Sequence, residues 1–178
     1  MMRVRVIEEH GYETALLGLS LSYGQEPGRM EVVSERLRFR GEGHNKFLES
    51  IVIWLDVDAP RYFWQQYDTY RIGVTKQSES TMHTMTKRRL GQEDFAYPIP
   101  LEHLAHLNRL IEKKAWEQVK RDLPESFLQR RIVCQNYMSL QRVIRQRKEH
   151  KLSEWAVFVG EVLRQAAHPE LLEREEAE

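Results

Sequence analysis

The feature that most constrains the fold is a short continuous apolar run at residues 50–57, SIVIWLDV. Its β-branched residues and its bounded length predict a buried β-strand. Residues 59–68 follow, with Pro60 at a position typical of a helix start, so we expect a helix there. That helix would carry three aromatic side chains into the core, those of Tyr62, Phe63 and Trp64.

The rest of the chain mixes both kinds of element. Apolar and charged residues alternate over residues 2–9 and predict a half-buried strand, whereas residues 81–89 are expected to be extended. Helical spacing of apolar residues predicts helices at residues 12–23, 30–39, 101–123, 125–148 and 152–168. We expect a cap at Ser153 and an acidic tail that frays from about residue 170. These patterns predict an α+β fold, a β-sheet flanked by helices with a long helical C-terminal half.

The charges of the chain are balanced, with 27 Lys and Arg against 27 Asp and Glu and a pI near 7.1. A domain that binds a nucleic-acid polymer usually carries a basic excess, so that partner is disfavoured, whereas a small anion needs only a local cluster of cations. No apolar run approaches transmembrane length, and MMRVRVIEEH does not have the pattern of a signal peptide. We therefore expect a cytoplasmic protein that does not bind membranes.

Cysteine and histidine offer little chemistry in this sequence. Cys134 is the only cysteine, so it forms no intramolecular disulfide, and no motif supplies the base that a nucleophilic thiol needs. We interpret it as a half-buried thiol on a helix. His103 and His106 lack the partner pattern of a zinc helix and are interpreted as surface residues, so no metal site is expected.

A polar segment at residues 67–85, YDTYRIGVTKQSESTMHTM, follows the predicted buried strand and aromatic helix. Its hydroxyls, the permissive Gly73 and the nearby cations have the chemistry of a loop that wraps a phosphate. The hydroxyls belong to Thr75, Ser78, Ser80 and Thr81, and the cations to Lys76 and residues 87–89. The alternative is a solvent-exposed Ser/Thr turn.

Several motifs in this order resemble the flavin-dependent thymidylate synthases, the ThyX-type family. GHNKFLES supplies the glycine-histidine pair and the glutamate of the family signature, at Gly43, His44 and Glu49. A glutamine follows at Gln66, and LPESFLQRRIVCQNYMSLQRVIRQR tracks the family without a gap. The resemblance extends from about residue 22 to residue 169 and implies a single ThyX-like domain over residues 1–178.

The resemblance also implies an activity, in which a one-carbon unit passes reductively from methylenetetrahydrofolate to C5 of dUMP, with FAD as cofactor and NADPH as electron source. The residues that would contact the flavin are Ser22, His44, Glu49, Tyr70, Arg71, Asn136 and Arg142. The residues that would contact the nucleotide are Gln66, Gln77, Ser78, Ser80, Lys120 and Arg147. Arg147 and Ser80 would have catalytic roles, Arg147 by hydrogen bonding to the uracil carbonyl. Family members assemble as homotetramers that share flavin between subunits.

The sequence departs from the family at several of these positions. The family triplet Arg-His-Arg reads Thr69, Tyr70, Arg71, and eight rather than seven residues separate Arg71 from Ser80. Met82 and Lys120 stand at two positions where the family has arginine. The family's Ala-Gln-x-Glu motif is replaced by LSEW at residues 152–155. An ammonium lacks the bidentate fork of a guanidinium. Three readings stay open: an active synthase, an enzyme with another nucleotide or product such as a hydroxymethylated pyrimidine, and a non-catalytic flavin or nucleotide binder.

Overall fold

The structure is a computed structural model that describes residues 1–173, apart from the side chain of Thr86. Its centre is a four-stranded antiparallel sheet in the order β1-β2-β4-β3. The strands are β1 (Arg3–His10), β2 (Val52–Pro60), β3 (Val74–Ser78) and β4 (Leu128–Asn136). The buried run predicted at residues 50–57 is the inner strand β2, which pairs with β1 on one side and β4 on the other.

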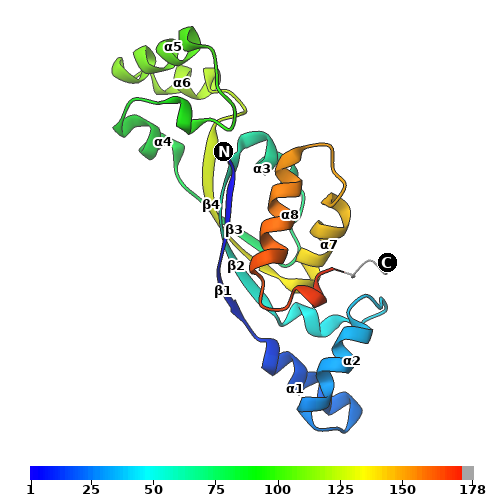
Figure 1. Ribbon diagram of the computed structural model, residues 1–178. Helices are drawn as coiled ribbons and strands as arrows, with labels where there is room; N and C mark the ends of the chain where they lie inside the picture. Colours follow the sequence, from blue (N-terminus) through cyan, green and yellow to red (C-terminus); the bar gives the residue numbers. More distant parts are fainter. Residues whose placement is uncertain (174–178) are drawn as a thin grey trace.

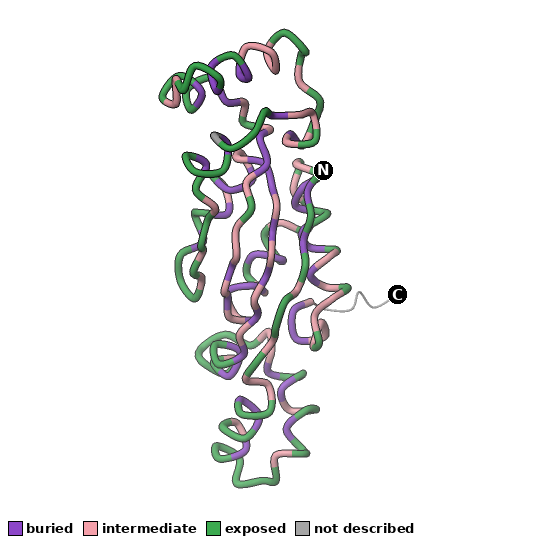
Figure 2. The backbone as a smooth tube through the Cα atoms, turned by 90° about the vertical axis from the view of Figure 1, so that its left-hand side faces the viewer, coloured by how far each residue is buried: buried purple, intermediate pink, exposed green. Residues whose placement is uncertain are grey.

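The two faces of the sheet have different surroundings. On one face Ile53, Leu55 and Val57 are fully buried. Three helices pack on that face: α3 (Arg61–Tyr67), α7 (Tyr137–Arg147) and α8 (Ser153–Gln165). On the other face Trp54 and Asp56 stay half-buried, and none of the described helices covers them (Figure 2). The core of this chain therefore lies on one side of the sheet.

Helical lobes extend from both ends of the sheet (Figure 1). The N-terminal lobe contains α1 (Tyr12–Tyr23) and α2 (Met30–Leu37). The opposite lobe contains α4 (Thr81–Thr84), α5 (Leu101–Glu112) and α6 (Trp116–Asp122), and it has an apolar cluster of its own. Short 3-10 helices connect these elements: η1 (Pro27–Arg29), η2 (Lys46–Glu49), η3 (Met85–Lys87), η4 (Gln92–Asp94) and η5 (Pro169–Leu171). Every helix among residues 1–173 is too short or too polar to span a lipid bilayer.

The α+β class predicted from the sequence is confirmed, together with β1, β2 and the helices α1, α2 and α3. The prediction of one helix over residues 125–148 is wrong in its first half, because Leu128–Asn136 is strand β4. Leu, Gln and Arg in this segment favour a helix locally. Backbone pairing with both β2 and β3 outweighs that preference. Cys134 is consequently half-buried on a strand, not on a helix.

Four further expectations are corrected. Within the polar segment Val74–Ser78 is an edge strand, and the stretch expected to be extended is helical at Thr81–Thr84 and Met85–Lys87. The helix expected at residues 101–123 is two helices, since Lys114 has a left-handed backbone (φ 56°) between α5 and α6. Residue Leu152, without a side-chain cap bond, occupies the N-cap of α8 in place of Ser153.

The tail predicted to fray from about residue 170 is ordered at its start. Leu171 and Leu172 are almost fully buried against the main core, at 0% and 1% exposure, because they close the space beside α2 and α7. Residues 174–178, which hold most of the acidic tail, lie outside the described residues. The extent of a single domain over residues 1–178 stays a prediction.

Candidate functional site

Helix α7 carries a predicted site residue at each end. Asn136 is its N-cap, and the Oδ1 of Asn136 accepts a 2.9 Å hydrogen bond from the backbone N–H of Ser139. Leu140, Val143 and Ile144 form the predicted buried stripe. Arg147 is the last residue of the helix and is half-buried, at the edge of that stripe as its spacing predicts.

The guanidinium of Arg147 is held by polar and aromatic groups. Its Nε donates to the hydroxyl of Tyr70 at 2.9 Å, and its Nη1 donates to the Oε1 of Gln66 at 3.3 Å. Its central carbon lies 5.6 Å from the ring centroid of Tyr70 and 4.8 Å from that of Trp155. No carboxylate among residues 1–173 forms an ion pair with it. Aromatic faces stabilise such a cation by about 0.5–2 kcal/mol without neutralising it. An anion or a carbonyl oxygen can therefore still bind there.

Three residues that the sequence placed in the site thus lie together: Gln66, Tyr70 and Arg147. A fourth, Trp155, was not predicted. Its indole N–H donates to the Oε1 of Gln66 at 2.7 Å. The one signal for Trp155 in the sequence is its position in LSEW, where the motif departs from the family.

Gly73, two residues after Arg71, contacts Asn136. The carbonyl of Gly73 accepts the backbone N–H of Asn136 at 3.0 Å. Gly73 has φ 69°, and a Cβ on it would lie 2.6 Å from the Nδ2 of Asn136. Glycine is therefore required here both by backbone conformation and by space. The Nδ2 of Asn136 and the exposed guanidinium of Arg71 make no hydrogen bond with another described residue, so both are available to a ligand.

A cavity of about 420 Å³ lies between α1 and η2. Three predicted flavin contacts line it, Ser22, His44 and Glu49, together with Lys46. The side chains of these four residues form no hydrogen bond or ion pair within the described part of the chain. The sequence motif GHNKFLES and the end of α1 therefore meet around one cavity.

The remaining predicted nucleotide contacts lie elsewhere. The ammonium of Lys120 on α6 donates to the hydroxyl of Thr81, the residue after Ser80. Burial, and then repulsion by Arg61, lower the pKa of Lys120. Ser80 is exposed at the start of α4, and its side chain makes no cap bond. Gln77 and Ser78 are exposed on β3. Arg142, a predicted flavin contact, is exposed on α7.

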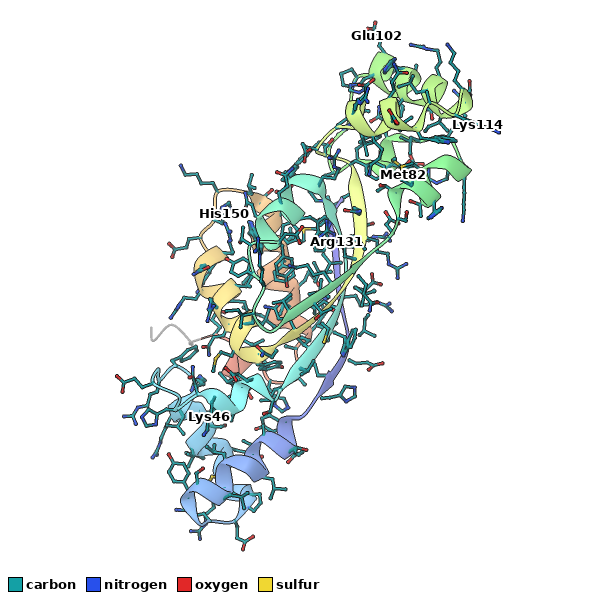
Figure 3. The ribbon with its side chains drawn as sticks, turned by 180° about the vertical axis from the view of Figure 1, so that it is seen from behind. Lys46, Met82, Glu102, Lys114, Arg131 and His150 are labelled. Atoms are coloured by element: carbon teal, nitrogen blue, oxygen red, sulfur yellow. The ribbon has the colours of Figure 1, made fainter. Side chains whose placement is uncertain are left out.

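One chain therefore distributes the predicted residues over the length of the molecule. Lys46, in the cavity beside α1, and Met82, near Ser80, lie at opposite ends (Figure 3). His150, whose ring centroid is 6.3 Å from that of Trp155, lies between these ends. A larger cavity, about 660 Å³, lies beside the opposite lobe, and its lining includes Arg88, one of the cations predicted at residues 87–89. Burial raises the pKa of the carboxyl of Glu79, which lines it.

Comparison with known proteins yields a match in structure alone. No family model matches the sequence, and no curated protein matches it. The structure is similar to a crystal structure of thymidylate synthase X (ThyX) from Helicobacter pylori with FAD and dUMP, with a TM-score of 0.82 and 16% identity over 97% of this chain and 98% of the other. A second Helicobacter pylori ThyX structure, complexed with FAD and dUMP, has a TM-score of 0.82 and 16% identity over 96% and 98% of the two chains. Because both chains are covered almost completely, the likeness is not limited to a shared substructure. The chain has the fold of the flavin-dependent thymidylate synthases.

Proposed function

We propose that this protein is a flavin-dependent enzyme of pyrimidine nucleotide metabolism that transfers a one-carbon unit reductively from methylenetetrahydrofolate to C5 of dUMP, with NADPH as electron source. The observation that carries the proposal is Arg147, a half-buried guanidinium without a carboxylate partner among the described residues. The fold supports it, because the similar ThyX structures contain FAD and dUMP.

The residues around the α1–η2 cavity fit a flavin nucleotide. Ser22, His44 and Lys46 offer donors without internal partners, and Glu49 offers an acceptor. FAD, when bound, supplies the hydride chemistry of the reaction. A cavity of about 420 Å³ takes only part of so large a cofactor. We infer that Arg71, Asn136 and Arg142 contribute to holding the remainder.

Arg147 would bind the pyrimidine in this proposal. Its free N–H groups would donate to a ring carbonyl and stabilise the negative charge that develops as C5 becomes nucleophilic. The amide of Gln66 lies beside it, 3.3 Å from the Nη1 of Arg147. Because these donors are fixed before the ligand arrives, little reorganisation is needed during the reaction.

Cys134 is a poor candidate for a nucleophile. Burial raises the pKa of its thiol, so the reactive thiolate is scarce at neutral pH. Its strand neighbours are Trp54 and Thr75, on the sheet face that the described helices leave uncovered. This placement supports a route in which no cysteine attacks the pyrimidine.

We assign the phosphate to the opposite lobe. Lys120 and the hydroxyls of Ser80 and Thr81 would hold it, with Gln77 and Ser78 nearby on β3. Ser80 would act through this contact in positioning the nucleotide. Met82 and Lys120 stand where the family has arginines, and neither offers the bidentate fork of a guanidinium. This difference favours one alternative to thymidylate synthesis, an enzyme that uses a related nucleotide or forms a different one-carbon product.

The distribution of these groups supports the homotetramer that the resemblance implies. The proposed flavin contacts around the α1–η2 cavity and the proposed phosphate contact Lys120 lie at opposite ends of one chain, so one chain cannot bring a flavin and a nucleotide held by them together. Copies of the chain related by symmetry can complete one site from several subunits. Light scattering at working concentration is expected to give the mass of a tetramer, and a monomer with full FAD affinity contradicts this assembly.

The test of the proposed function has two steps. FAD titrated into apoprotein is expected to give saturable flavin fluorescence changes below about 1 mM, which corresponds to roughly 4 kcal/mol. The loaded protein is then incubated with NADPH, methylenetetrahydrofolate and dUMP, and products are separated by mass. A methylated product supports the proposal and a hydroxymethylated one the alternative, whereas unchanged dUMP despite bound FAD contradicts both.

A further inference from the structure

The side-chain amide of Gln66 has its orientation fixed by two donors. The indole N–H of Trp155 and the Nη1 of Arg147 both donate to its Oε1, at 2.7 Å and 3.3 Å. Indole and guanidinium groups carry N–H donors and no acceptor. The amide oxygen of Gln66 must therefore face the indole and the guanidinium, because the amide NH₂ group in that place could not accept a hydrogen bond from either of them.

The fixed orientation determines what Gln66 can offer a ligand. Both lone pairs of its oxygen are engaged, and its Nε2 makes no hydrogen bond with another described residue. The Nη2 of Arg147 is likewise unbonded within residues 1–173. Tyr70 is buried and its hydroxyl is committed, because it accepts from Arg147 and donates to Gln146 at 2.8 Å. The free groups at this place are N–H donors.

Trp155 is a rigid support for this arrangement. It is fully buried, and its ring packs 4.4 Å from that of Phe63 and 5.7 Å from those of Tyr67 and Phe158, measured between centroids. A side chain fixed in this way cannot rotate to follow the amide of Gln66. The position of the indole therefore determines the orientation of the Gln66 amide.

We propose that Trp155 is a positioning residue that, through Gln66, makes this site select a pyrimidine with a carbonyl at C4 and reject one with an amino group at C4. The inference rests on the proposed function. It adds the structural basis on which the site would discriminate uracil nucleotides from cytosine nucleotides. An amino group placed against the N–H donors of Gln66 and Arg147 leaves the donors of both ligand and protein without an acceptor. Such an unpaired contact lowers the affinity for a ligand far more than the loss of one methyl group does.

The test compares dUMP and dCMP binding to FAD-loaded full-length protein by calorimetry. Wild type is expected to prefer dUMP by about tenfold or more. In Gln66→Glu one carboxylate oxygen still accepts from Trp155 and Arg147, and the other presents an acceptor where the NH₂ group was. The preference should then fall below about threefold or invert in favour of dCMP. Gln118→Glu, an exposed glutamine on α6, adds the same charge away from Gln66. Any effect of that charge on Lys120 concerns the phosphate that both nucleotides share, so the ratio should stay unchanged.

Trp155→Phe keeps the buried ring and removes only the indole donor. The amide of Gln66 is then held by the Nη1 of Arg147 alone, at 3.3 Å, and the dUMP preference should fall. The Gln66→Glu comparison does not depend on whether the core accepts Trp155→Phe. If wild type binds dUMP and dCMP equally, or if Gln66→Glu keeps the wild-type ratio, the inference is wrong while the proposed function stands. If wild type binds FAD but neither nucleotide, the proposed function fails and the inference with it.

Discussion

The hydroxyl of Tyr70 accepts a 2.9 Å hydrogen bond from the Nε of Arg147, a residue 77 positions further along the chain. This bond joins the loop after α3 to the last turn of α7. It uses the Nε of the guanidinium and leaves the Nη2 available for a ligand. The family signature places a histidine at the position of Tyr70, so the phenol is a feature of this chain.

Arg147→Ala tests whether Arg147 contacts the nucleotide. We expect FAD affinity to change little and dUMP affinity to fall by roughly 1.5–3 kcal/mol, through loss of a charge-assisted hydrogen bond. Calorimetry with dUMP measures the effect. The control is Arg145→Ala, an exposed arginine on the same helix, which should alter dUMP affinity and stability by less than about 0.5 kcal/mol. Equal dUMP affinities in Arg147→Ala and wild type would remove Arg147 from the site.

Gly73→Ala tests the close approach of Gly73 and Asn136. The left-handed backbone costs an alanine about 1–2 kcal/mol, and the new Cβ also has to displace the Asn136 side chain. We expect the free energy of unfolding, measured in urea, to fall by roughly 2–4 kcal/mol. Gly24→Ala is a matched control, with φ 59° and no atom within 4 Å of its Cβ. If both variants lose the same stability, the contact with Asn136 does not constrain position 73.

Asn136→Asp separates the two roles of Asn136. The carboxylate still accepts the N–H of Ser139 and places negative charge at the N-terminus of α7, so stability should stay equal or rise by about 0.5 kcal/mol. The amide donor is lost, and FAD affinity should fall about tenfold. Asn136→Ala should lose about 1 kcal/mol of stability as well as affinity, because it removes the cap. FAD binding unchanged in Asn136→Asp would show that the amide does not contact the flavin.

Stability is expected to fall as the pH rises above 10. Burial raises the pKa of Tyr67, Tyr62 and Tyr137 above the ordinary value of 10.0, with help from Glu154 and Glu9 for the last two. The unfolded chain releases these protons first, so their stabilising contribution is complete below pH 10 and is lost as the pH rises toward the folded-state pKa. Urea midpoints between pH 8 and 11.5 measure the loss.

Tyr67→Phe identifies the share of Tyr67 in that pH dependence. The variant leaves the Oε1 of Gln135 without its donor and should be less stable than wild type by about 1–3 kcal/mol at pH 8. Above pH 10 the two stability curves should approach each other, because the variant has one fewer proton to lose. Parallel curves up to pH 11.5 would contradict the assignment.

The sequence alone determined the parts of the molecule that depend on local pattern. The β-branched run of β2 and the aromatic helix after it fold as predicted, because their preferences agree with their environment. The spacing of Leu140, Val143 and Ile144 was enough to place Arg147 at the edge of a buried face. The order of the motifs also indicated the ThyX fold, at an identity of only 16% to its solved examples.

The tertiary structure decided what depends on residues far apart in the chain. Residues 128–136 have helix-favouring side chains, yet they become strand β4 because unpaired backbone groups of β2 and β3 on both sides need partners. The partner of Gln66 lies 89 positions away, at Trp155, and no local pattern records that pairing. Hydrogen-bond donors without acceptors are costly once buried, so the amide of Gln66 turns its oxygen to Trp155 and Arg147 only when folding brings the three side chains together.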